Sequence, residues 1–192
     1  MISGEPLVEL RADLMGLAAE ELKGLIGLAD TEIVTCHSAE AEHIYLAAIE
    51  AGAWAVDIEL DTPEAVLLPL LKAARERGVR VILSHHFDHT PSPEHLKEMA
   101  KRAFTHHADI AKIITTATTT AEAIIPLQLY YDLPAERLIA FAMGREGAFS
   151  RRLSLLLGAP YTYVAPTEGA ATAEGQPTRA ELQALSEEGF DL

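Results

Sequence analysis

The pattern that decides the fold lies in residues 79–114, which read VRVILSHHFDHTPSPEHLKEMAKRAFTHHADIAKII. Apolar runs near its two ends, at 79–83 and 108–114, predict buried strands. Between them, Ser92-Pro93-Glu94 supplies the N-cap, the first-turn proline and the first-turn acid of a helix. One face of that helix is apolar and consists of Leu96, Met99, Ala100, Ala103 and Phe104. A strand–helix–strand unit of this kind places its two strands parallel in a sheet.

The same alternation extends over the rest of the chain. Further strands are predicted at 6–10, 32–36, 53–60, 137–142 and 160–164. Further helices are predicted at 18–28, 38–52, 62–78, 120–131 and 144–157, and a last one opens at the capping-box pair Thr178 and Glu181. Seven strand–helix units without a hairpin signal predict a parallel sheet in a single α/β domain over residues 1–192.

Two parallel architectures fit this order, an open doubly wound sheet and a TIM-type barrel that lacks one unit. Polar residues follow the ends of many predicted strands, namely Glu9, Arg11, His37, Glu59, Asp61, Ser84, His86 and Lys112. A barrel gathers its chemistry at the C-terminal ends of many strands, whereas an open sheet concentrates it near one crevice. The sequence also contains no glycine-rich phosphate loop. The predicted fold class is therefore a TIM-type parallel β/α barrel.

Composition limits the partners. The 192 residues include 15 basic and 29 acidic side chains, a formal charge of −14, which argues against nucleic acid and anionic membrane surfaces. The one cysteine, Cys36, excludes an internal disulfide and a cysteine-built metal cage. The first residues show no leader pattern, and no apolar run approaches the length of a membrane span. We expect a soluble cytoplasmic protein whose partner is a small molecule.

Lys112 is a single cation within the apolar run 108–114. Burial disfavours the ammonium form of a lysine and favours the neutral amine, which can attack a carbonyl. The alternative is a lysine near the end of its strand whose amine extends to solvent. The preceding strand ends in the proton-transfer groups Ser84, His85 and His86, and this neighbourhood favours the catalytic interpretation.

Glu9, Arg11 and Asp13 alternate along the end of the first predicted strand. Their side chains would share one face of the strand and could bind a hydroxylated or carboxylated ligand. The alternative interpretation is a ladder of solvated charges with no ligand. The histidines lack the spacing of a metal site, so no metal is expected.

Two features near the C-terminus are less specific. Arg151 and Arg152 fall within a predicted helix, where a solvated face is the simple interpretation. The stretch 167–176 is long and rich in small residues, which is typical of a lid over a site.

Six motifs follow one another along the chain: Glu9-x-Arg11-x-Asp13, Asp57-Ile58-Glu59-Leu60, Ser84-x-His86 before Thr90-Pro91, Asp109-Ile110-x-Lys112-Ile113, Met143-Gly144 followed by Ser150-Arg151, and Ala171-Thr172-Ala173-Glu174-Gly175-Gln176. Together they resemble type I 3-dehydroquinate dehydratase over nearly the whole chain. The resemblance implies a TIM-type barrel, commonly a homodimer, that works without a cofactor as a carbon–oxygen lyase of the shikimate pathway.

Carried over position by position, the resemblance assigns the Schiff-base lysine to Lys112 and the general acid/base to His86. It implies five substrate-binding residues, which are Glu9 and Arg11 for hydroxyls, Arg151 for the carboxylate, and Thr172 and Gln176 in the lid. In the implied reaction, Lys112 condenses with the ketone of 3-dehydroquinate, and His86 removes the neighbouring proton and later protonates the departing hydroxyl. The products are 3-dehydroshikimate and water.

Three departures from the family pattern leave alternatives open. His37 stands where the family has an arginine, with Glu40 or Glu42 as the stand-in for a loop glutamate. The His-Asp-Phe of many relatives appears as His86-Phe87-Asp88, with one residue fewer before Pro91, so the choice of His86 over His85 depends on register. The family's first strand and helix have no counterpart, which predicts a barrel one unit short. Alternative functions are another Schiff-base lyase of the aldolase kind, a metal-dependent hydrolase, and a non-catalytic metabolite-binding descendant.

Overall fold

The structure, a computed structural model, describes residues 7–29, 31–165, 167, 169, 171 and 173–181. These residues group into two compact units. Of the described residues, the N-terminal unit comprises those up to Ser84 together with His107–Asp109, and the C-terminal unit comprises His85–His106 and those from Ile110 onward. Within this described part, every helix is too short or too polar to cross a membrane.

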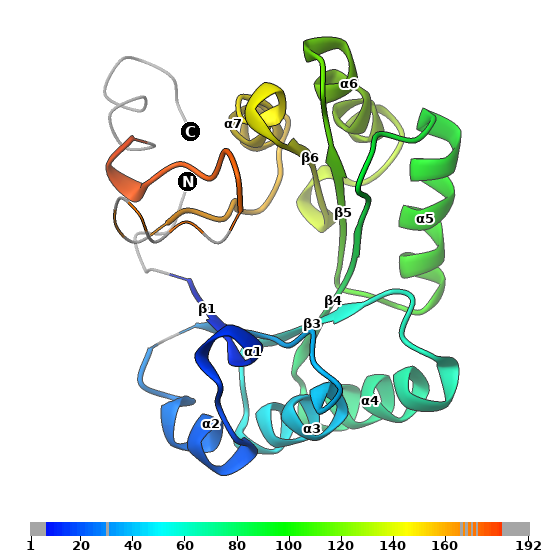
Figure 1. Cartoon of the computed structure of the whole chain (residues 1–192). Coiled ribbons are helices and arrows are strands. Elements are labelled where there is room, and N and C mark those ends of the chain that lie inside the picture. Colours follow the sequence, from blue (N-terminus) through cyan, green and yellow to red (C-terminus); the bar gives the residue numbers. More distant parts are fainter. Residues whose placement is uncertain are drawn as a thin grey trace. The chain divides into compact units, whose positions relative to one another are not determined.

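Parallel strands alternate with helices in the N-terminal unit (Figure 1). The strands are β1 (Val8–Arg11), β2 (Glu32–Thr35), β3 (Ala55–Glu59) and β4 (Arg80–His86), and β4 ends in the C-terminal unit. The helices are α1 (Ala12–Met15), α2 (Ala19–Leu25), α3 (Ala41–Ala51) and α4 (Glu64–Arg77). Glycines in the left-handed conformation end α3 and α4 at Gly52 and Gly78, as the sequence pattern predicts.

The register of these strands separates polar from apolar side chains. Arg11 pairs with Thr35, Thr35 with Asp57, and Glu59 with Ser84, and partners in a parallel sheet point to the same face. Toward the C-terminal ends of the strands that face is polar, whereas the alternating positions Val34, Val56, Ile58 and Leu83 are fully buried apolar residues. Because α3 packs against β2 and β3, the apolar face has a helical cover.

Tyr45 of α3 joins β2 to β3 through its buried hydroxyl. The hydroxyl donates to the carbonyl oxygens of Cys36, at 2.9 Å, and Asp57, at 2.6 Å, and it accepts a hydrogen bond from the Cys36 N–H at 3.2 Å. Burial raises the pKa of the Tyr45 phenol above its ordinary value, so the group stays a neutral donor. It fixes the spacing of the two strands that carry Thr35 and Asp57.

We expect Tyr45→Phe to lower the free energy of unfolding by about 1–3 kcal/mol, the cost of leaving buried backbone polar groups without a partner. Urea denaturation of wild type and variant measures this difference. Tyr131→Phe is the matched control, because the Tyr131 side chain is 92% exposed. Equal stability of Tyr45→Phe and the control would contradict the assigned role.

The C-terminal unit contains the end of β4 and two further strands, β5 (Ile110–Thr116) and β6 (Leu138–Met143). Its helices are α5 (Pro93–Thr105), α6 (Thr120–Ile124) and α7 (Ser150–Leu156), with 3-10 turns η1 (Ile125–Tyr131), η2 (Ala135–Arg137) and η3 (Arg145–Gly147). Helix α5 packs against β5, and α7 against β6 (Figure 1). In the β5–β6 pair, Lys112 lies opposite Ile139, and Ile114 opposite Phe141.

The strands follow one another in the sheet in the order β1-β2-β3-β4-β5-β6. This order and the parallel pairing confirm the predicted parallel β/α fold class. The seventh strand, predicted at 160–164, is wrong: residues 161–164 are irregular. Ala165 instead forms an isolated parallel bridge with Thr178, in which its N–H donates to the Pro177 carbonyl and its own carbonyl accepts from Arg179.

Two predicted helices are interrupted. The helix predicted at 120–131 changes to a 3-10 turn after Ile124, because Pro126 has no N–H to continue the α-helical ladder. The helix predicted at 144–157 begins only at Ser150. Before it, a side chain at Gly147 would lie 2.6 Å from the Ala142 carbonyl oxygen, so the chain turns tightly against the end of β6.

Candidate active site

Lys112 lies in the middle of β5 with only 6% of its surface exposed. The interpretation that its amine extends to solvent is therefore wrong. One contact of the amine is the ring of Tyr163, whose centroid lies 4.4 Å from Nζ. The sequence pattern assigned no role to Tyr163, although aromatic residues alternate at 161 and 163 beside the site.

The hydrogen bonds between β4 and β5 place His86 and His85 on opposite faces of the sheet. The Phe87 N–H donates to the Ile114 carbonyl at 2.8 Å, which aligns His86 with Ile114 in a parallel ladder. Ile114 is two residues from Lys112 and shares its face, so His86 lies on the Lys112 face. His85 lies on the other face with Phe87, and their ring centroids are 4.2 Å apart.

Phe87 shows what covers the His85 face. Its ring also contacts His95 of α5, with a centroid separation of 5.7 Å. His85 thus belongs to an aromatic cluster under α5, whereas His86 shares its face with the buried lysine.

Arg151, at the start of α7, is 2% exposed, so the simple interpretation of a solvated arginine is wrong. Its guanidinium carbon lies over the ring of Phe141, 4.3 Å from the ring centroid. The register of β5 and β6 places Phe141 on the same face of the sheet as Lys112. Neighbouring Ser150 fixes the helix start, because its hydroxyl accepts from the Ala142 N–H at 2.8 Å and donates to the Gly147 carbonyl at 2.6 Å.

Within the described chain, Arg151 Nε has no hydrogen-bond partner. Burial lowers the pKa of Arg151 to about 10, and no acidic side chain contributes to that shift. A buried, unpaired guanidinium is a strong site for a carboxylate, since it offers charged donors in a dry environment.

We expect Arg151→Met to weaken catalysis and strengthen folding. Loss of hydrogen bonds to a substrate carboxylate should lower kcat/KM by roughly 10- to 150-fold. The pKa of Arg151 is lower in the folded state, so the folded protein disfavours the charged form at every pH below about 10. Removing the charge should therefore raise the free energy of unfolding at neutral pH by up to roughly 3 kcal/mol.

Steady-state kinetics and urea denaturation measure the two effects of this substitution. Arg152→Met, at the neighbouring and partly exposed position, is the control and should change neither. A lower stability of Arg151→Met would show that a partner compensates its charge.

The lid predicted at 167–176 is only partly described. Thr172 lies outside the described residues. Gln176 is described, and Gly175 beside it packs so closely that a side chain there would lie 3.0 Å from Ala148 and from the Gly144 carbonyl oxygen. The end of the stretch thus lies against the turn that leads into α7. The helix predicted after it opens as expected, because Thr178 Oγ1 and the Glu181 carboxylate accept from each other's backbone N–H.

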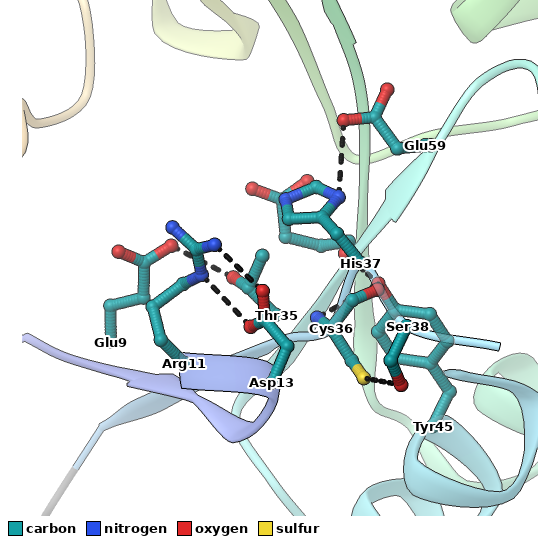
Figure 2. Close-up of polar contacts among 10 residues, drawn as sticks. Glu9, Arg11, Asp13, Thr35, Cys36, His37, Ser38, Tyr45 and Glu59 are labelled. Carbon is teal, nitrogen blue, oxygen red and sulfur yellow. Dashed lines mark hydrogen bonds and ion pairs between the residues drawn. The ribbon is translucent and has the colours of Figure 1, made fainter. Parts of the chain in front are cut away.

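In the N-terminal unit, polar residues gather at the C-terminal ends of β1, β2 and β3 (Figure 2). Thr35 Oγ1 donates to Glu9 at 2.8 Å, and Arg11 forms two hydrogen bonds to Asp13, at 3.1 and 2.8 Å. Asp13 was predicted on the strand but lies in α1, and it folds back to meet Arg11. This pairing lowers the pKa of the Asp13 carboxyl, so the pair stays charged.

His37 adds a second pair to this cluster. Its Nδ1 lies 3.4 Å from Glu59 Oε1 (Figure 2). Sequence reasoning gave no role to Thr35, which holds Glu9 in place. Thr35 lies directly opposite Arg11 in the β1–β2 register, and its position at the end of the predicted strand 32–36 is the sequence signal that could have indicated it. The cluster combines carboxylates with a guanidinium and an imidazole, a set suited to sugar-like hydroxyl groups.

Among the residues that the structure describes, no three His, Cys, Asp or Glu side chains come close enough together to hold a metal ion. In the C-terminal unit, a buried amine, an imidazole on the same face and a buried guanidinium form a set of groups suited to covalent catalysis on an anionic carbonyl compound.

Comparison with known proteins identifies the family. A family model described as type I 3-dehydroquinase matches residues 2–188, and the chain therefore belongs to this family. A 3-dehydroquinate dehydratase of Dehalococcoides mccartyi is 37% identical over 190 residues, which cover 93% of this chain and 84% of the relative.

Solved structures show the same fold. The type I 3-dehydroquinate dehydratase of Clostridium difficile superposes with a TM-score of 0.83 at 21% identity, over 94% of this chain and 80% of that one. The 3-dehydroquinate dehydratase of Geobacillus kaustophilus gives a TM-score of 0.82 at 25% identity, over 94% and 79% of the two chains. The TIM-type class predicted from the sequence is confirmed by these similarities.

Proposed function

We propose that Lys112 and His86 carry out in this chain the reaction of its family, the dehydration of 3-dehydroquinate to 3-dehydroshikimate. Membership of the family makes the chain a carbon–oxygen lyase of the shikimate pathway. The observation that supports the assignment of residues is the burial of Lys112 on the strand face that it shares with His86.

The proposed chemistry begins at the Lys112 amine. Nζ adds to the ketone carbon of the substrate, and loss of water gives a protonated imine. The positive nitrogen withdraws electrons from the neighbouring carbon, so a base can remove a proton there. His86 takes this proton, and the electron pair forms the carbon–carbon double bond as hydroxyl departs. His86 returns the proton to that leaving group, and hydrolysis of the imine releases 3-dehydroshikimate.

The remaining proposed contacts place the substrate. Arg151 would bind the carboxylate, because it is buried and lacks an acidic neighbour in the described chain. Glu9 and Arg11 would bind hydroxyl groups, because Thr35 and Asp13 hold them in fixed positions. Thr172 and Gln176 would close the site as lid residues. The single domain over 1–192, the homodimer and the cytoplasmic location stay predictions.

Borohydride reduction tests the proposal. Reduction in the presence of 3-dehydroquinate should convert the imine into a stable amine on the peptide that contains Lys112. The other lysines of the chain, Lys23, Lys72, Lys97 and Lys101, serve as internal controls in the same digest. An adduct on one of these, or none in a preparation that generates enone absorbance, would contradict the assignment. An aldolase-like lyase would also label Lys112 with its own substrate but would produce no enone from 3-dehydroquinate.

A further inference from the structure

Tyr163 lies against the nitrogen that the proposed function makes the centre of the reaction. Its ring centroid is 4.4 Å from Lys112 Nζ, and both residues belong to the C-terminal unit. The ring is held from the side by Tyr161, whose ring meets it edge-on at 5.8 Å and 70°. An irregular segment thus presents one aromatic face to the lysine and a second ring that supports the first.

The face of an aromatic ring carries partial negative charge and attracts a cation within about 6 Å of its centroid. The attraction strengthens when water is excluded, and Lys112 is 6% exposed. The ring therefore acts on Lys112 as a fixed electrostatic group. Unlike a carboxylate, it accepts no proton and cannot compete with His86 as a base.

In the proposed reaction this nitrogen carries a positive charge once the protonated imine has formed. The ring centroid lies 4.4 Å from Nζ, so the charge of the imine develops beside the ring face. A ring fixed at this distance also limits the directions from which Nζ can meet a carbonyl carbon.

We propose that Tyr163 is a positioning residue for Lys112, whose ring face stabilises the protonated imine and directs the amine. This inference rests on the proposed function, because it concerns the nitrogen on which the imine forms.

Changing the charge of the ring without changing its shape tests the inference. Position 163 would carry phenylalanine, then 4-fluoro-, 3,5-difluoro- and pentafluorophenylalanine, which progressively remove negative charge from the ring face at nearly constant size. Tyr163→Phe should keep kcat within about threefold of wild type. Along the series kcat should fall stepwise, by roughly 2- to 30-fold from phenylalanine to the pentafluoro residue, the range expected for a cation over an aromatic face. The amount of borohydride adduct on Lys112 should fall in parallel, whereas melting temperatures should change little.

A non-aromatic variant provides a second test. Tyr163→Leu should lose at least as much kcat as the pentafluoro variant, and Tyr163→Phe is the conservative variant that restores it. The same fluorinated residues at Tyr131, which is 92% exposed, should have no effect. A flat fluorination series, or equal kcat in the leucine and phenylalanine variants, would overturn the inference. If only this inference fails, the wild-type protein will still form the borohydride adduct on Lys112. If the wild-type protein forms no such adduct, the proposed function itself has failed.

Discussion

Replacement of Lys112 by methionine is expected to lower kcat for 3-dehydroquinate by more than about four orders of magnitude, the scale on which loss of a covalent nucleophile acts. Methionine fills a similar volume and suits the apolar neighbourhood of β5, so the fold should survive. Its side chain cannot form an imine, and the borohydride adduct should disappear together with the activity. Stopped-time assays of enone formation and mass spectrometry of the reduced digest measure the two losses.

Two control variants distinguish loss of the nucleophile from two other effects. One tests loss of the positive charge at position 112, and the other tests loss of a lysine elsewhere in the chain. Lys112→Arg keeps a cation in β5 but offers no amine that forms an imine, and it should be as inactive as Lys112→Met. Lys97→Met removes an amine that pairs with Asp132 at 2.7 Å on the surface, and it should stay within about twofold of wild type. Activity of Lys112→Met within tenfold of wild type would show that the reaction proceeds without the imine.

Much of this fold is predictable from sequence because local signals agree with the tertiary structure. Gly52 and Gly78 end helices in a conformation that glycine adopts at low cost, and Ser92 caps α5 by accepting from the His95 N–H. Ile82 and Ile113, near the centres of the two apolar runs, are fully buried in their strands. In each case a few neighbouring residues contain the whole signal.

The errors arise where distant residues decide the structure. A run such as 160–164 resembles a strand, but a strand also needs a partner on the ladder, and the bridge at Ala165 is made to Thr178. The local sequence predicts a solvated helix residue at Arg151. Neither its contact with the Phe141 ring nor the turn fixed by Ser150 can be inferred from its neighbours in sequence. A site is assembled from residues far apart in the chain. The local pattern around Arg151 therefore could not reveal its role, whereas the family resemblance, which compares motifs along the whole chain, pointed to it.

The choice between His85 and His86 shows how structure adds to sequence at the level of one residue. Adjacent histidines cannot both lie on the face of Lys112, because successive side chains of a strand point to opposite faces. The sequence allowed either one, since the segment after the histidines is shortened. The bond from the Phe87 N–H to the Ile114 carbonyl fixes the register, and the contact of the tilted His85 ring with Phe87 accounts for the second imidazole.

His86→Ala is therefore expected to lower kcat by about 10²- to 10⁴-fold, the range for loss of a positioned general acid/base. Imine formation requires the Lys112 amine rather than proton removal from substrate carbon, so His86→Ala should still yield the borohydride adduct. His85→Phe keeps an aromatic ring against Phe87 and should remain within about tenfold of wild type. Enone assays of both variants, with reductive trapping of each, distinguish the two positions. Near-wild-type turnover in His86→Ala together with inactivity in His85→Phe would show that the other histidine faces Lys112, and that the register of β4 on β5 differs by one residue in the active protein.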